Sequence, residues 1–167
     1  MLAILNNIRM LLLASWLGAA VFFSAVVAPS AFHVLRALDL TNASEIAGTI
    51  VTRTLSVVNT SGLVVSLLLL VTALALKESY GQARFVIQIV LLLIVAATTA
   101  VGQWVIAAKM RGLRAAMHAP IDQVAASDPN RIAFAALHGY SVAAHGVAII
   151  AGLIAFFVIA KRQIELK

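Results

Sequence analysis

The sequence predicts an all-α integral membrane protein, a bundle of four transmembrane helices forming one domain over residues 1–167. Of its residues, 63% are hydrophobic and 11% are charged, whereas a soluble domain is about half apolar and about a quarter charged. Four charge-free apolar runs, 10–35, 54–76, 85–108 and 132–160, each exceed the roughly 20 helical residues that cross a hydrocarbon core. The runs lack the alternation of barrel strands, so helices are the spanning structure that remains.

The first helix is predicted at about residues 8–34. Its apolar run is too long for a cleaved signal peptide, and Pro29, directly after Ala28, is a poor neighbour for a cleavage site, so we expect this helix to be retained. Pro29 cannot donate a backbone hydrogen bond to Ala25, and this predicts a kink beside His33. Gly18 is predicted to let a neighbouring helix approach Trp16 closely.

The second and third helices are predicted at about residues 43–76 and 82–117. Asn42 and Glu45 resemble a capping box at the start of the second helix. At about 1.5 Å per residue, each helix is roughly 50 Å long, which exceeds the roughly 30 Å of hydrocarbon. Because a short turn joins them, both extensions emerge on one side as a helical hairpin. A break at Gly48 or Gly112, which would lay these turns along the membrane surface, is the alternative.

The fourth helix is predicted at about residues 129–161, because Asp128 and Pro129 form a strong start signal. Within its apolar run, His138 and His145 are seven residues apart and therefore share one helix face with Ser141. Ionisable groups inside membrane spans are costly and are functional candidates by default. We therefore expect this polar stripe to face the bundle interior.

Three interpretations of this interior stay open. It is a non-enzymatic site for a small ligand, a lipid or a partner protein; or histidines from different helices bind haem b or copper; or the chain is an accessory subunit of a membrane complex. The candidate residues of the polar interior are Trp16, Gly18, Pro29, His33, Asn59, His138, Ser141 and His145. The candidate ligands of a metal or haem are His33, His118, His138 and His145. His138 and His145 lie about 10 Å apart along one helix, so they cannot share one ion.

The net charge of +6 does not indicate a nucleic-acid partner, because the basic residues lie between apolar runs and not on one face. Membrane lipids are the expected partners, with a homo-oligomer or a membrane complex as further options. Residues predicted to contact headgroups or set topology are Arg53, Lys109, Arg111, Arg114, Lys161 and Arg162. The position of Lys161 and Arg162 next to a span favours cytoplasmic termini in a bacterial inner membrane. The chain has no cysteine, and no hydrolase motif is present.

Two motifs carry a family resemblance. Trp16-x-Gly18 followed by Pro29 in the first helix, and Phe134-x-x-Leu137-His138-x-x-Ser141 in the last, resemble the transmembrane protein 205-like family. Its members are small four-helix membrane proteins, and the bacterial ones are described as a domain of unknown function. The resemblance therefore implies an architecture and a membrane location, without an activity. Trp-x-Gly near the start of a span is also similar to copper-resistance membrane proteins of the CopD type.

Overall fold

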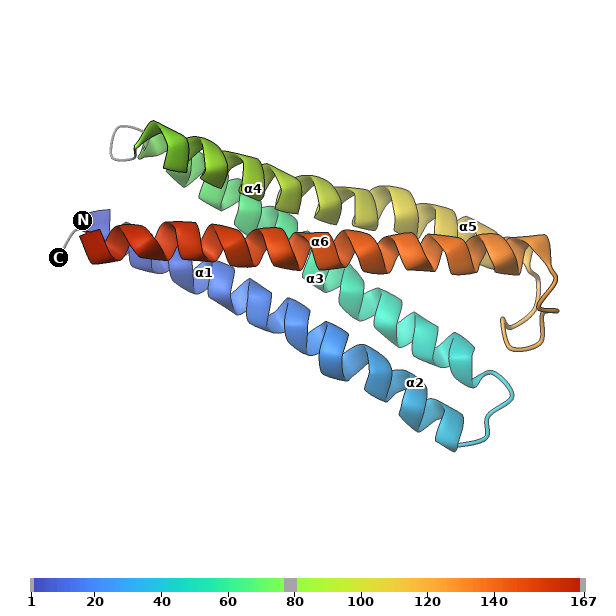
Figure 1. Cartoon of the computed structure of the whole chain (residues 1–167). Coiled ribbons are helices and arrows are strands. Elements are labelled where there is room, and N and C mark those ends of the chain that lie inside the picture. The colour runs from blue at the N-terminus through green and yellow to red at the C-terminus, as the bar shows by residue number, and fades with distance from the viewer. Residues whose placement is uncertain (1, 77–80, 166–167) are drawn as a thin grey trace.

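The computed structural model describes residues 2–76 and 81–165, and every regular element in this part of the chain is helical (Figure 1). In chain order the elements are α1 (Leu2–Phe22), the π-helical segment η1 (Phe23–Val27), α2 (Ala28–Ala37), α3 (Ala43–Ala75), α4 (Gln82–Ala100), the π-helical segment η3 (Val101–Ile106), α5 (Ala107–Ala116) and α6 (Pro129–Glu165). Because α1, η1 and α2 run on without a break, as do α4, η3 and α5, these elements make four rods. The prediction of four membrane-spanning helices is confirmed.

The rods form a four-helix bundle in which α1 and α4 each pack against both α3 and α6. The order around the bundle is therefore α1, α3, α4, α6, with α1 opposite α4 and α3 opposite α6. Both chain ends lie at one end of the bundle, and the α2–α3 and α5–α6 connections lie at the other (Figure 1). We call these the termini end and the loop end.

The apolar spans measure 33 to 35 residues in all four rods. The expected length of the second and third helices is therefore present, and the first and fourth helices share it. Both α3 and α5 continue through their glycines, so the alternative of a break at Gly48 or Gly112 is wrong. These glycines have no neighbour within 4 Å of a built Cβ atom, and nothing at either position forces the helix to bend.

The predicted effect of Pro29 on the helix appears as a π-helical turn. The turn before it, Phe23–Val27, winds as a π-helix, and the Ala28 N–H donates to the carbonyl of Phe23. A π turn is wider than an α turn, and it relieves the clash between a proline ring and the preceding carbonyl. The rod therefore continues into α2, and the loss of a regular hydrogen bond is absorbed near the middle of the membrane.

The two long helices that begin at the loop end are capped differently. Asp128 accepts backbone hydrogen bonds from Asn130 at 2.8 Å and Arg131 at 3.1 Å, which confirms the start signal predicted for α6. The predicted capping box of α3 is wrong, because the Asn42 side chain makes no cap hydrogen bond. Asp122, from the α5–α6 connection, accepts the first backbone N–H groups of α3 instead.

Candidate functional site

Polar side chains are buried at the middle of the bundle. Asn59 is 5% exposed and His145 is 9% exposed. Asn59 is the central residue of α3, and His145 lies next to the middle of the apolar run 132–160. These two predicted interior residues are therefore buried near the centre of the membrane, on rods that face each other across the bundle.

Trp16 lies on the termini side of this level and fills the centre of the bundle. Its indole Nε1 donates a hydrogen bond of 3.0 Å to the carbonyl of Val58. A Cβ atom built on Gly62 would lie 2.6 Å from that nitrogen, and one built on Gly152 would lie 2.8 Å from the indole Cζ3. The ring therefore reaches from α3 to α6, and a glycine on each helix makes room for it.

Gly18 has no part in this contact. It is exposed, with no neighbour within 4 Å of a built Cβ atom. Two residues along a helix correspond to about 200° of rotation, so a glycine two positions after an inward tryptophan points outward. The prediction that Gly18 permits close helix packing is wrong, and Gly62 and Gly152 have that role.

His145 is buried, and the backbone carbonyl of Ala20 is a polar group close to its imidazole. The Phe23 ring and the imidazole pack in a T-shaped arrangement, with a centroid distance of 5.9 Å and an interplanar angle of 89°. Within the described part of the chain, neither Nδ1 nor Nε2 of His145 makes a hydrogen bond of normal geometry. An imidazole always carries at least one N–H donor, and the neutral ring also carries one acceptor. Such a group at the level of hydrocarbon costs free energy unless a polar partner reaches it.

On the opposite side of the bundle, α3 packs closely on η3. A Cβ atom built on Gly102 would lie 3.2 Å from Nδ2 of Asn59. One residue further, the side-chain amide of Gln103 donates a hydrogen bond of 2.8 Å to the hydroxyl of Ser56. Both contacts join the first half of the chain, which runs from α1 to α3, to the second half, which runs from α4 to α6.

The remaining predicted interior residues are not buried. Ser141 is half-buried, and Pro29, His33 and His138 lie on the outer surface of the bundle. The expectation that the histidine stripe of α6 faces inward therefore holds for His145 and is wrong for His138. His138 is exposed, and α2 packs mainly on α3.

The four histidines do not form a cluster. His33, His118 and His138 are exposed, and His145 contacts Phe23. Among the residues that the structure describes, no three His, Cys, Asp or Glu side chains come together in a group that could hold a metal ion. The structure therefore does not bring these histidines together as the prediction of a haem or copper site requires.

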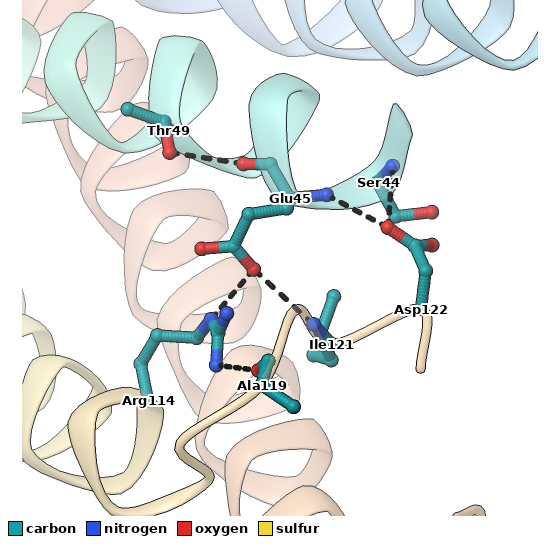
Figure 2. Close-up of polar contacts among 7 residues, drawn as sticks. All are labelled: Ser44, Glu45, Thr49, Arg114, Ala119, Ile121 and Asp122. Atoms are coloured by element: carbon teal, nitrogen blue, oxygen red, sulfur yellow. Dashed lines mark hydrogen bonds and ion pairs between the residues drawn. The ribbon is translucent and has the colours of Figure 1, made fainter. Parts of the chain in front are cut away.

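One predicted headgroup residue has another contact. Figure 2 shows Arg114, whose Nε lies 2.6 Å from Oε2 of Glu45 and whose guanidinium also donates to the carbonyl of Ala119 at 2.7 Å. The backbone N–H of Ile121 donates to the same Glu45 oxygen at 3.3 Å. Arg53, Lys109, Arg111 and Lys161 are exposed. The side chain of Arg162 lies outside the described residues.

Asp122 completes this extramembrane cluster. Its Oδ2 accepts hydrogen bonds from the backbone N–H groups of Ser44 at 3.0 Å and Glu45 at 3.2 Å (Figure 2). Partial burial raises the pKa of Asp122, but the hydrogen bonds from Ser44 and Glu45 and the charge of Arg36 outweigh it, so the pKa lies below its ordinary value. Sequence reasoning missed Asp122, because no local signal links a loop residue to a helix that begins 78 residues earlier.

Sequence reasoning also missed a group of buried polar side chains near the termini end. Asn6 and Arg9 on α1 are 2% and 1% exposed, and Gln88 on α4 is fully buried. Asn6 and Arg9 precede Leu13 and Trp16 at the spacing of one helix face. That spacing was a usable signal, because a polar residue in register with a buried apolar face points inward.

These features define a class of protein: a polytopic membrane protein built as a four-helix bundle with a polar centre. The chain belongs to the family described as Domain of unknown function (DUF4149), whose model matches residues 11–119. The match covers most of the first three rods and stops before α6. No curated protein and no solved structure matches the chain.

Proposed function

We propose that this protein is a non-enzymatic membrane protein whose interior binds a neutral, lipid-soluble molecule that carries a hydroxyl group. The observation that carries the proposal is the imidazole of His145, which is buried between α1 and α6 beside the backbone carbonyl of Ala20 and makes no hydrogen bond of normal geometry in the described part of the chain. Buried polar groups in proteins have hydrogen-bond partners, and an exception calls for an explanation. A bound molecule supplies the missing partner.

The surroundings of His145 define the chemistry of the ligand. The apolar run 132–160 holds no acidic residue, lysine or arginine, and the imidazole packs against the apolar ring of Phe23. A charged ligand would lack a counter-ion at this depth, so the ligand is neutral. One hydroxyl group can accept from the N–H of the imidazole and donate to its other nitrogen or to a nearby carbonyl. A position near the membrane centre requires the rest of the molecule to be apolar.

The ligand proposal is tested by thermal unfolding of the detergent-purified protein with farnesol, and with farnesene as its hydrocarbon counterpart. Ligand at about 100 times its Kd stabilises the native state by about 2.7 kcal/mol, which for a chain of this size raises Tm by several degrees. We expect farnesol to raise Tm and farnesene to leave it unchanged. His145→Phe removes the farnesol effect, whereas His145→Gln, which keeps a donor and an acceptor, retains part of it.

His138→Phe is the matched control, because it removes an exposed imidazole from the same helix. Equal Tm shifts from farnesol and farnesene, or a farnesol shift that survives His145→Phe, would overturn the proposal.

An absorption spectrum of the same sample tests the haem alternative. A Soret band that disappears in His145→Phe would show that the ligand of His145 is haem and not a lipid-soluble alcohol.

We also place the protein in a bacterial inner membrane with both termini in the cytoplasm, and we group it with the transmembrane protein 205-like proteins. The orientation is supported by the basic residues that follow the last span. The chain lacks cysteine, so single cysteines introduced at Ala3 and at Ser127 report each end of the bundle separately. In intact cells, an impermeant maleimide should label the Ser127→Cys variant alone; labelling of Ala3→Cys alone reverses the orientation.

A further inference from the structure

The two helical hairpins have the same construction. The first consists of α1, η1 and α2, with 21, 5 and 10 residues, followed by the 33-residue α3. The second consists of α4, η3 and α5, with 19, 6 and 10 residues, followed by the 37-residue α6. Each π-helical segment interrupts its rod at the same place. π-helical segments are rare and often lie at functional sites, so their occurrence at matching positions is informative.

The buried faces repeat as well. In the first rod of each hairpin, buried residues correspond at a constant separation of 79 positions: Arg9 and Gln88, Leu13 and Leu92, Trp16 and Val95, Leu17 and Ala96, Ala20 and Thr99, Phe23 and Gly102. In the second rod they correspond at 86 positions: Asn59 and His145, Gly62 and Ala148, Ser66 and Gly152, Leu69 and Ala155, Ala73 and Ile159.

The contacts between the hairpins follow the same correspondence. Phe23 packs on His145, and their counterparts Gly102 and Asn59 pack on each other. The order of the rods places α1 opposite α4 and α3 opposite α6, and both hairpins start at the termini end. A two-fold axis along the membrane normal would therefore exchange the hairpins. Parallel repeats of this kind occur in transporters, where the interface between repeats near the bilayer midplane holds the substrate.

The two interfaces between the hairpins differ in how they are closed. We call the interface of α3 with α4, η3 and α5 the sealed seam, because three contacts hold it: Asn59 with Gly102, Gln103 with Ser56, and Arg114 with Glu45. The open seam is the interface of α6 with α1, η1 and α2. In the open seam, the contact of Phe23 with His145 corresponds to the contact of Gly102 with Asn59.

The other two sealing contacts have no equivalent in the open seam. The counterparts of Gln103 and Ser56 are Ser24 and Val142. Ser24 donates to the Ala20 carbonyl within its own helix, and valine offers no polar group. The counterparts of Arg114 and Glu45 are Leu35 and Arg131, and the guanidinium of Arg131 donates to the Val124 carbonyl. Toward the loop end, α2 packs on α3 and α5 packs on α6, so the two hairpins diverge on both sides (Figure 1). The Arg114–Glu45 pair bridges the divergence between α5 and α3, and the described residues contain no such ion pair between α2 and α6.

We propose that the two hairpins are structural repeats and that the open seam between α2 and α6 is the entrance through which a neutral lipid-soluble alcohol reaches His145 from the bilayer. This inference rests on the proposed function for the identity of the ligand. Trp16 fills the centre on the termini side of His145, so the ligand enters from the loop half of the membrane. The contacts of the sealed seam hold the two hairpins together while the open seam admits the ligand.

The repeat correspondence provides its own experiment, in which the missing ion pair is transplanted into the open seam. By the repeat correspondence, Leu35→Glu introduces a carboxylate at the counterpart of Arg114, so that it can pair with the native Arg131, the counterpart of Glu45, when α2 and α6 approach each other. Leu35→Gln is the control of similar shape without charge, and Arg131→Gln in the Leu35→Glu background removes the pair again. Spin labels at Leu38→Cys and Ile132→Cys, introduced into this cysteine-free chain, report the distance between α2 and α6 by pulsed dipolar spectroscopy.

We expect Leu35→Glu to shorten the distance between the labels and to slow farnesol binding roughly three- to fivefold, the population ratio that an exposed ion pair produces. Leu35→Gln and the variant that also carries Arg131→Gln should behave as the parent. If Leu35→Glu leaves the distance unchanged, the repeat-based entrance is wrong. If the parent binds no farnesol, the proposed function fails, while the distance measurement still decides whether the open seam closes.

Discussion

The indole nitrogen of Trp16 donates a 3.0 Å hydrogen bond to the backbone carbonyl of Val58, and this contact joins the first rod to the second at the bundle centre. The ring lies against glycine on both α3 and α6. The packing of the first, second and fourth rods therefore depends on one side chain. Because protein interiors are close-packed, this arrangement has no room for an added methyl group.

We expect Gly62→Ala to destabilise the protein by about 1–3 kcal/mol, because its Cβ atom would overlap the Trp16 ring. Combining it with Trp16→Phe should recover part of the loss, since a smaller ring vacates the space. The measurement is a double-mutant cycle of unfolding in detergent. Gly18→Ala is the control: no atom lies within 4 Å of its Cβ position, so it should show only the gain of about 0.5–1 kcal/mol that alanine has over glycine within a helix. Additive effects of Gly62→Ala and Trp16→Phe would contradict the packing argument.

Glu45→Gln should loosen the α5–α6 connection. The carboxylate receives the guanidinium of Arg114 and the backbone N–H of Ile121, and both ion-pair side chains are about one quarter exposed. Partial exposure limits the expected loss of stability to about 1 kcal/mol. Hydrogen exchange at residues 117–123 measures the loosening. Arg53→Gln, which removes an exposed charge from the same helix, should leave this exchange unchanged.

The hydrogen bonds that Asp122, in the α5–α6 connection, accepts from the start of α3 should be lost in acid. Because the folded-state pKa of Asp122 is below its ordinary value of 3.8, its contribution to stability is complete above that value and is lost as the pH falls through the folded-state pKa. Amide exchange at Ser44 and Glu45, corrected for intrinsic rates, should stay constant from neutral pH to about pH 5 and accelerate below about pH 3.8. Asp122→Asn should remove this pH dependence, and acceleration already at pH 6 would contradict the assignment.

Gln88→Leu should stabilise the protein. Gln88 is fully buried, and neither atom of its side-chain amide has a hydrogen-bond partner in the described part of the chain. Replacing an unpartnered buried amide with an apolar side chain of similar size removes a desolvation penalty of about 1–3 kcal/mol. The readout is Tm in detergent, compared with Leu92→Gln, which places an amide one turn deeper and should lower Tm. A lower Tm for Gln88→Leu would mean that this amide has a partner of its own.

The sequence alone determined the class of fold, because the requirement for uninterrupted apolar helices in lipid acts on each span separately. Four spans, the Asp128 cap and the burial of His145 follow from local composition and helical periodicity. The inward direction of Trp16 follows in the same way, and so would that of Arg9, since both continue one helix face.

The tertiary structure decided which polar groups meet, because contacts between helices depend on how the rods lean against one another. Helical periodicity placed His138 and His145 on one face, but in the structure His138 is exposed and His145 is buried. The Trp16–Val58 hydrogen bond, the Asp122 cap and the pairing of Glu45 with Arg114 join residues 42 to 78 positions apart. No local pattern carries that information, since each contact is set by the packing of whole helices.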